Sequence, residues 1–531
     1  MLRHCWILTL VYLGLQFVHV FADEFFDENL YIRSLNDGKV YTHFQFKTLL
    51  EDAVPRLPNS LSQKDEPLGQ ILREYAVTEL HLSLNAGKWD YRTWGYPNGS
   101  SVGNGAELWV WMGEDETHKF DARWQGVRNA LAGLFCASLG ELNERRTTSP
   151  TYAFQPTGDI PSGNESKILN AVTSLSTSLD VPHRLAYASH PSEHICTENL
   201  TPFIKLLPCK AYSGIAALLN PHRLFDADWH GMSIQALWNA EKGIEIELSV
   251  QAVFDPVRLH GRKDRSWSFS HLFGKNIQGQ CSVARDSRIE VDLPSSPFTL
   301  TPPPITNEVA QYNVNTIQEP LDVVLKYSDE TSFVYPTEIK SSIPLSIERS
   351  HSGTSQAKGR MHVTIKNMQN FSQLVTYLET PPWIIKFYLH TLTIRVNDEE
   401  ELRNDILQFI NYIPTESNKP TLFESILLLP PQSTVHMTID FDKTFLRYTE
   451  HPPDAQRGWD LPSALLIPLP SNVSNQVLPR MYTKTLLIDL ATPDFSMPYN
   501  VITMTGALMA MLFGNIFNLL TREFVAVSLD K

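Results

Sequence analysis

The chain has 531 residues, of which 42% are apolar and 19% are charged, and its formal net charge at pH 7 is −14. One hydrophobic core rarely serves so long a chain, so the composition predicts a globular protein with two soluble domains. The acidic balance argues against nucleic acid as a partner, because a negative surface repels phosphate backbones. The local exception is a basic stretch, interpreted as a solvated loop in preference to a lipid-phosphate patch: Arg258, Arg262, Lys263 and Arg265.

The N-terminal residues 1–22 follow the pattern of a secretory signal peptide. Arg3 provides a positive start, Trp6–Phe21 is mostly apolar, and Ala22 is a small residue at the expected cleavage site before Asp23. We therefore expect the rest of the chain to be delivered across a membrane into an oxidising compartment. Five asparagines then become candidates for glycosylation: Asn98, Asn164, Asn199, Asn370 and Asn472.

Most of the predicted elements are β-strands. Four segments alternate between apolar and polar residues, which places one strand face on a core and the other in water. They are residues 244–251, 361–365, 387–396 and 435–442. Residues 106–112 are apolar almost throughout and predict a central strand. Helical spacing of apolar residues occurs in three segments, at residues 68–77, 124–139 and 400–409.

A proline-rich stretch at residues 294–304 separates two strand-rich regions. Because proline provides no backbone N–H, such a stretch favours an extended linker over a sheet interior. We therefore predict an N-terminal β-rich domain at residues 23–293 and a β-sandwich domain at residues 305–490. The expected fold class is mainly β with some α, with two sandwich-like domains and a single C-terminal transmembrane helix.

Residues 501–520 contain no formal charge and are long enough, at about 1.5 Å per residue, to cross the roughly 30 Å of bilayer hydrocarbon. Residues 491–500 would form a short stalk before this helix, and residues 521–531 a cytosolic tail. Charged residues in that tail favour a retained membrane helix over a removable signal for lipid anchoring. The predicted topology is single-pass type I.

One face of the predicted membrane helix consists of small and polar residues. Gly506, Ala510, Gly514 and Asn518 recur every four residues, so they share a helix face. Small residues allow close approach of a second helix, and an asparagine amide in hydrocarbon favours an interhelical hydrogen bond. We therefore expect this face to pack against helices of other membrane proteins, the alternative being an inert anchor.

The chain without its signal peptide would retain four cysteines, Cys136, Cys196, Cys209 and Cys281. The sequence leaves three complete pairings open. Cys136 follows the apolar spacing of the predicted helix at residues 124–139, which indicates a buried thiol in a core. Of the other three, two can close an internal bridge, so the third would be free or bonded to another chain.

The sequence contains no motif typical of a metalloprotease, a serine hydrolase or a phosphate-binding loop. The nearest arrangement is His190, His194 and Cys196, which lacks a fourth ligand for zinc. We interpret these histidines as surface residues beside a disulfide cysteine, and Asp440 and Asp442 as a solvated strand face. The alternative is a lumenal cysteine hydrolase with Cys196 as its nucleophile and His194 as its base. We expect neither a metal nor a cofactor.

Five longer motifs are similar to those of a known family. They are residues 79–83, 105–111, 135–139, 196–209 and 492–502. They resemble the PIG-T family, the phosphatidylinositol-glycan class T subunits of GPI transamidase, and the resemblance runs from about Phe44 to Leu520. The resemblance implies a non-catalytic subunit in the endoplasmic reticulum membrane, with most of the chain in the lumen.

In such a complex, a caspase-like cysteine peptidase subunit, PIG-K, cleaves a protein's C-terminal signal and passes the acyl group to a GPI lipid. The resemblance implies a scaffold that is bonded to a PIG-K-like subunit through Cys196, with Cys209 and Cys281 as an internal disulfide. Further partners would be PIG-S-like, PIG-U-like and GAA-like subunits. A last group of residues would help to line a GPI site at head-group depth, the alternative being a solvated stalk: Asp494, Ser496 and Asn500.

Overall fold

The structure is a computed structural model. It describes residues 24–50, 67–99, 101–113, 119–158, 183–239, 242–261, 263–294, 296–304, 309–316, 320–328, 330–337, 343–353, 355–397, 403–416, 419–451, 457–470, 478–492, 496–525 and 527. The expected signal peptide at residues 1–22 therefore lies outside the described residues. The chain divides into two compact units, of which the smaller comprises residues 445–459 and 488–531.

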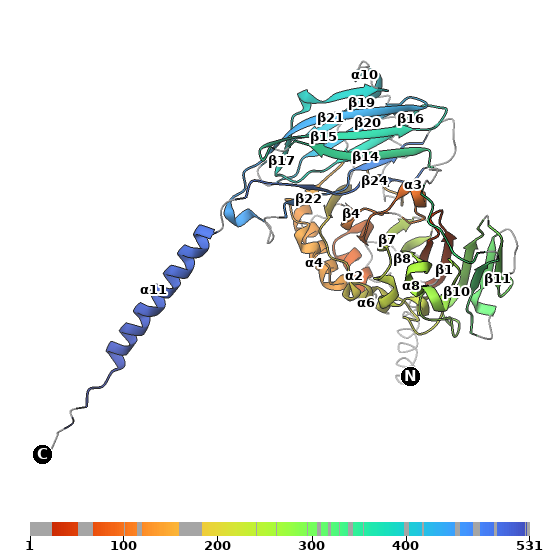
Figure 1. Cartoon of the computed structure of the whole chain (residues 1–531), viewed down its shortest axis with the longest axis horizontal. Helices are drawn as coiled ribbons and strands as arrows, with labels where there is room; N and C mark the ends of the chain where they lie inside the picture. Colours follow the sequence, from red (N-terminus) through yellow and green to blue (C-terminus); the bar gives the residue numbers. More distant parts are fainter. Residues whose placement is uncertain are drawn as a thin grey trace, which may run out of the picture. The chain divides into compact units, whose positions relative to one another are not determined.

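A ten-stranded sheet forms the N-terminal part of the larger unit (Figure 1). Its strands, in spatial order, are β12 (Ala310–Asn313), β10 (Ala284–Asp292), β1 (Glu24–Ser34), β2 (Val40–Leu50), β8 (Gly243–Phe254), β7 (Trp229–Asn239), β3 (Val77–Ala86), β4 (Gly105–Gly113), β6 (His183–His190) and β5 (Thr147–Thr148). Neighbouring strands are antiparallel except β1 and β10, which are parallel. A smaller sheet contains β11 (Phe298–Thr301), β13 (Val324–Tyr327) and β9 (Trp267–Ser268).

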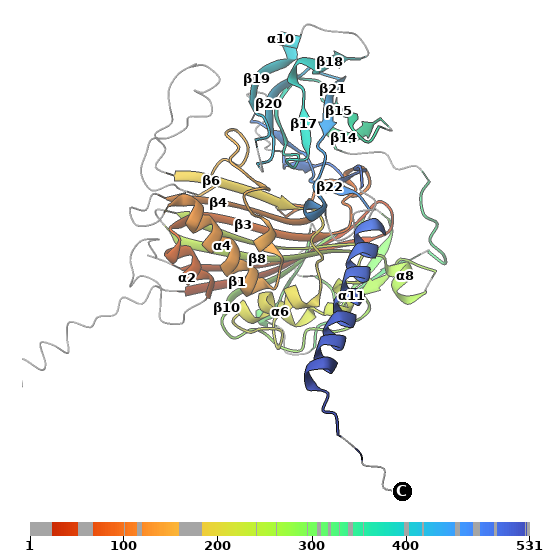
Figure 2. The same ribbon diagram turned by 90° about the vertical axis from the view of Figure 1, so that its left-hand side faces the viewer.

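Helices cover one face of the ten-stranded sheet (Figure 2). They are α2 (Pro67–Glu74), α4 (Phe120–Phe135) and α6 (Thr197–Leu206). In α4, the buried residues Trp124, Val127, Leu131 and Phe135 recur at helical spacing and give the helix one apolar face. This face packs in the same core as strand residues such as Leu80. The central position of β4 explains its continuous apolar sequence, because both of its faces are buried.

A β-sandwich follows in the sequence (Figure 1). Its first sheet contains β14 (Leu345–Ser352), β15 (Lys358–Asn367), β21 (Ser433–Lys443) and β17 (Ile385–Phe387), with β18 (Thr393–Val396) also paired to β21. Its second sheet contains β19 (Leu407–Ile413), β20 (Leu422–Leu429), β16 (Gln373–Glu379), β23 (Leu465–Pro468) and β24 (Met481–Tyr482). In the first sheet, alternate residues of β15 and β21 are buried, among them Met361 and Val363, as period-two side chains require. In the second sheet, β16 and β20 are buried at nearly every residue.

The remaining elements are short, apart from the last helix. The strands are β22 (Trp459–Leu461) and β25 (Leu486–Ile488). The helices are α3 (Tyr91–Trp94), α7 (Pro221–Leu224), α8 (Pro256–His260), α9 (Phe269–Leu272), α10 (Arg403–Ile406) and α11 (Ser496–Thr521). The 3₁₀ turns are η1 (Leu139–Glu141), η2 (Ile215–Leu218), η3 (Val314–Thr316), η4 (Leu389–Thr391) and η5 (Tyr448–Glu450).

Buried polar contacts join the ten-stranded sheet region to the sandwich within the larger unit. The Glu424 carboxylate of β20 is fully buried and accepts hydrogen bonds from the backbone N–H groups of Thr151, Tyr152 and Ala153, at 2.6–2.9 Å. The Tyr482 hydroxyl donates to the buried Glu107 carboxylate at 2.9 Å. Each carboxylate would be costly to bury without these donors, so the contacts specify one docking arrangement.

The structure confirms the mainly β fold class with a single C-terminal apolar helix. The strands predicted at residues 106–112, 244–251, 361–365 and 435–442 lie in β4, β8, β15 and β21. Residues 387–396 do not form one strand, because the turn η4 separates the end of β17 from β18. The prediction of a helix at residues 400–409 is wrong except for the single turn α10 (Arg403–Ile406). Residues from Leu407 onward pair with β20, so tertiary pairing overrides the local helical spacing.

The proline-rich residues 294–304 contain a strand of their own, β11. The next strand, β12, pairs with β10 and so returns the chain to the ten-stranded sheet. This sheet therefore continues beyond the stretch that was expected to be a linker.

Candidate functional site

Cys196 lies at the start of α6, where one buried side chain fixes the backbone. The backbone N–H of Cys196 donates to Asn199 Oδ1 at 2.8 Å. The Asn199 amide nitrogen donates in turn to the carbonyl oxygens of Phe135 and Cys136, each at 3.0 Å, at the end of α4. Asn199 is 1% exposed. Its three hydrogen bonds hold the start of α6 against the end of α4 in one geometry.

Asn199 therefore does not fit its predicted glycosylation. An amide nitrogen that is buried and bonded to two carbonyl groups is not accessible for attachment of an oligosaccharide. Asn98 and Asn370, in contrast, are exposed. The two other candidates, Asn164 and Asn472, lie outside the described residues.

Two cysteines in the described part of the chain carry free thiols, Cys136 and Cys196. Cys196 is half-buried, whereas Cys136 is exposed. The prediction of a buried Cys136 is thus wrong. The residue follows the last residue of α4 and has a left-handed backbone with φ of 52°, so its side chain no longer follows the apolar face of the helix.

Cys209 and Cys281 form a disulfide with a Cα–Cα distance of 5.8 Å, the pairing that the resemblance implied. The bond connects the segment after α6 to the segment before β10. Cys281 is 1% exposed, and the nearby Gly214 has a φ of +69°. A Cβ at this glycine would lie 2.9 Å from the Cys281 Cβ, so the backbone approaches the disulfide more closely than a side chain allows.

The arrangement around Cys196 does not resemble a nucleophilic site. His194 is exposed, and within the described ranges no hydrogen bond joins it to Cys196. Burial lowers the pKa of the neighbouring His190 to about 4, so this histidine is neutral at physiological pH. No group of three or more potential metal ligands occurs among the residues that the structure describes.

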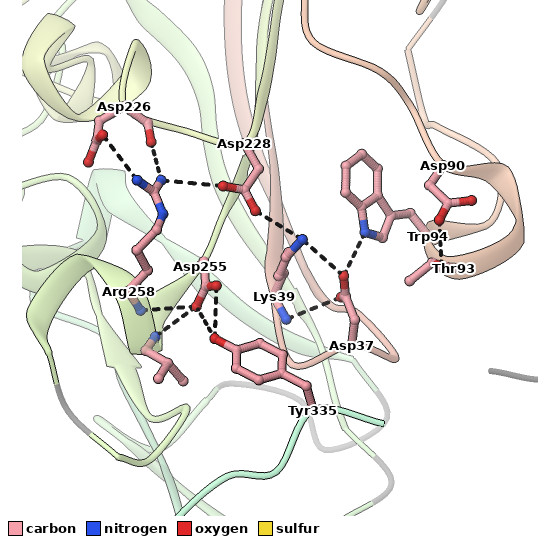
Figure 3. A network of polar contacts seen from close by, with 11 residues as sticks. Asp37, Lys39, Asp90, Thr93, Trp94, Asp226, Asp228, Asp255, Arg258 and Tyr335 are labelled. Atoms are coloured by element: carbon pink, nitrogen blue, oxygen red, sulfur yellow. Dashed lines mark hydrogen bonds and ion pairs between the residues drawn. The ribbon is translucent and has the colours of Figure 1, made fainter. Parts of the chain in front are cut away.

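Two arginines of the basic stretch, Arg258 and Arg265, form ion pairs with carboxylates of the same chain, and Figure 3 shows those of Arg258. Arg258 forms ion pairs with Asp226 at 3.2 Å and with Asp228 at 3.3 Å, and Lys39 binds the other oxygen of Asp228 at 2.9 Å. Arg265 pairs with Glu330 at 2.9 Å. These arginines are therefore neutralised locally, and the stretch does not present a uniformly positive surface to a membrane.

The C-terminal helix α11 is long and apolar enough to span a membrane over Tyr499–Thr521, a stretch of 23 residues. At about 1.5 Å per residue this stretch measures roughly 34 Å. A Cβ added at Gly506 or at Gly514 would meet no atom within 4 Å other than the nearby backbone of α11 itself. The predicted face of Gly506, Ala510, Gly514 and Asn518 is therefore open to a second helix.

The three candidate GPI-binding residues stand around the start of α11. The helix begins at Ser496, so part of the predicted stalk is already helical. Ser496 and Asn500 are four residues apart and share one helix face. Asn500 is exposed. Asp494 lies outside the described residues, two positions before the helix.

These features define a mainly β protein with one helix able to span a membrane. The chain matches the model of the family described as "Gpi16 subunit, GPI transamidase component" over residues 10–266 and 257–531, and it belongs to this family. The human protein named "GPI-anchor transamidase component PIGT" is 32% identical over 545 residues, which cover 94% of this chain and 90% of that protein.

Two fungal relatives give the same result. The Schizosaccharomyces pombe protein named "GPI transamidase component PIG-T homolog" is 31% identical, over 95% of this chain and 91% of its own length. The Saccharomyces cerevisiae protein named "GPI transamidase component GPI16" is 29% identical, over 98% and 95%. The chain therefore has a role in the GPI transamidase complex, and other subunits of that complex are its partners.

Proposed function

We propose that this chain is the non-catalytic scaffold of a GPI transamidase in the endoplasmic reticulum membrane. It holds a PIG-K-like peptidase subunit through an interchain disulfide at Cys196, and it helps to position the GPI lipid. The family membership over nearly the whole chain is the observation on which the proposal rests. PIG-S-like, PIG-U-like and GAA-like subunits complete the assembly, and the bulk of the chain lies in the lumen.

The geometry at Cys196 supports the covalent link. Its thiol is free and half-buried, and its backbone is fixed by Asn199. A thiol on a rigid segment keeps a bonded partner in one orientation. The bond also makes every other contact between the two chains intramolecular, which raises their effective concentration.

Non-reducing electrophoresis of the purified complex tests the link. Wild-type protein should migrate as an adduct with a second polypeptide, and Cys196→Ser should abolish this adduct. Cys136→Ser is the matched control, because Cys136 is the second free thiol of the described chain. Persistence of the adduct in the Cys196 variant would refute the assignment.

The start of α11 supports the lipid site. A carboxylate at Asp494 suits an ammonium group of glucosamine or ethanolamine, whereas the Ser496 hydroxyl and the Asn500 amide suit sugar hydroxyls. In the sequence, all three residues come within a few positions of Tyr499, where the candidate membrane span begins, and head-group depth is therefore part of the proposal. Asp494→Ala should weaken retention of GPI by the assembled complex, and Asp489→Ala, an exposed carboxylate five positions earlier, should not. Equal retention by both variants contradicts the lipid site.

A further inference from the structure

The sandwich contains an open cleft of about 660 Å³ on the outer side of its first sheet. The cleft lies where the turn between β14 and β15 meets η4 and the end of β21. Its volume is within the range of small-ligand sites. Among its lining side chains are Lys358, Arg360, Tyr388, His390, Asp440 and Asp442.

The strand register determines why these side chains meet. Arg360 of β15 and Asp440 of β21 are directly opposite each other, and both point away from the core because their neighbours Met361 and Ile439 are buried. Arg360 Nη2 donates to Asp440 Oδ2 at 3.1 Å, and Arg360 Nε donates to Oδ1 at 2.5 Å. The two planar groups are thus held in a fixed bidentate arrangement.

A second hydrogen bond orders the lining beside this pair. The Tyr388 hydroxyl donates to Asp442 Oδ2 at 2.7 Å. Among the described residues, Asp442 Oδ1 has no hydrogen-bond partner and remains an acceptor. The rings of Tyr388 and His390 lie 5.7 Å apart, so aromatic faces stand beside the polar groups. Lys358 is exposed and is available as a further donor.

Two common classes of ligand, phosphates and extended peptides, do not suit the residues that line this cleft. Its two cations are balanced by two carboxylates, so a phosphate or a nucleotide would meet repulsion as well as attraction. An extended peptide usually binds by adding a strand to a free sheet edge. Here β15 is paired on both sides, to β14 and to β21, so its backbone groups are already bonded. Both classes therefore fit poorly.

We propose that this cleft binds a neutral oligosaccharide. Sugar hydroxyls both donate and accept hydrogen bonds, so they complement carboxylate oxygens and guanidinium or ammonium N–H groups together. The preformed Arg360–Asp440 and Tyr388–Asp442 contacts lower the ordering cost of binding. Such a sugar has two sources, an N-linked glycan of a protein or the glycan of a GPI lipid, and the second source rests on the proposed function.

Titration of the purified, detergent-solubilised complex with mannotriose tests the cleft, with ligand-detected NMR as the readout. Asp442→Ala removes an acceptor, and Tyr388→Phe keeps the ring but removes its hydroxyl. Each should weaken binding about tenfold, the usual effect of losing one hydrogen bond to a charged group. Glu348→Gln is the matched control, since Glu348 is an exposed carboxylate of β14 that does not line the cleft. It should bind as the wild type does.

Absence of mannotriose binding by the wild type, or equal binding by the wild type and both cleft variants, overturns the proposal. Tighter binding of tripolyphosphate than of mannotriose also overturns it. An unchanged melting temperature of each variant complex ensures that lost binding is not lost folding. Released N-glycans and a GPI head-group fragment, titrated separately, distinguish the two sources. Asp494→Ala should leave mannotriose binding intact, so failure of the lipid site and failure of the cleft are distinguishable.

Discussion

Replacement of Asn199 by alanine should destabilise the protein strongly, although the residue stands in a glycosylation sequon. The side chain makes three hydrogen bonds and is 1% exposed. Its loss leaves the buried Phe135 carbonyl without this partner, and also the partly buried Cys136 carbonyl and Cys196 N–H. At about 1–3 kcal/mol for the buried group, and less for the two part-buried groups that water can reach, the expected cost is about 2–4 kcal/mol.

The matched control removes the sequon without touching the buried amide. Thr201→Ala abolishes the glycosylation pattern but deletes only an exposed hydroxyl, whose bond to the Thr197 carbonyl is local to α6. Alanine is also a better helix former than threonine, so this variant should be as stable as the wild type. A glycan-dependent effect would appear in both variants, whereas a structural effect appears only in Asn199→Ala.

The assays are thermal unfolding of the purified full-length chain and non-reducing electrophoresis of the purified complex. Asn199→Ala should lower the melting temperature by several degrees and reduce the fraction of chain in the interchain adduct, because the Cys196 backbone is no longer held. Equal melting temperatures for the two variants would refute the reasoning. So would a glycan found at Asn199 by peptide mass spectrometry.

Three further predictions follow from the same structure. Joint replacement of Cys209 and Cys281 by serine should cost about 4 kcal/mol, because the bond closes a loop with a sequence separation of 72, and an unchanged denaturation midpoint contradicts this. Burial lowers the pKa of His43 from 6.5 to about 4. Between these pH values the imidazole is protonated in the unfolded chain but neutral in the folded one, so the free energy of unfolding falls as the pH drops from 6.5 to 4. His43→Gln should flatten the dependence of melting temperature on pH in that window, and an identical slope would count against it. Gly514→Ile should reduce co-purification of other subunits in mild detergent, whereas Ile516→Leu, away from the small-residue face, should not; equal recovery argues for an inert anchor.

The regular parts of the fold were predictable because their cause is local. Period-two alternation places one face of β15 and of β21 on a core, and a continuous apolar run places β4 between two layers. The alternation in β8 predicted the strand but not its environment, because every residue of β8 from Leu248 onward is buried. The helix predicted at residues 400–409 failed because pairing with β20 is a contact between distant segments. The parallel pairing of β1 with β10 has the same origin, since no local pattern reports which strands become neighbours.

Within the candidate site, the sequence identified the residues but not their environments. The Asn-x-Thr pattern is the same for a glycosylated asparagine on the surface and for the buried Asn199. Only the packing of Asn199 against the end of α4 distinguishes the two cases. Cys136 was misplaced because one left-handed residue redirects its side chain after a regular helix. The outward alternation of Asp440 predicted a solvated face, whereas the register that places Arg360 opposite it depends on strand pairing.

Disulfide mapping of the native complex by mass spectrometry tests the central claim most directly. Digestion under non-reducing conditions should release the peptide that contains Cys196 joined to a peptide of a caspase-like subunit, with Cys209 joined to Cys281. Recovery of Cys196 as a free thiol, or joined to Cys136 of the same chain, would contradict a scaffold that holds the peptidase covalently.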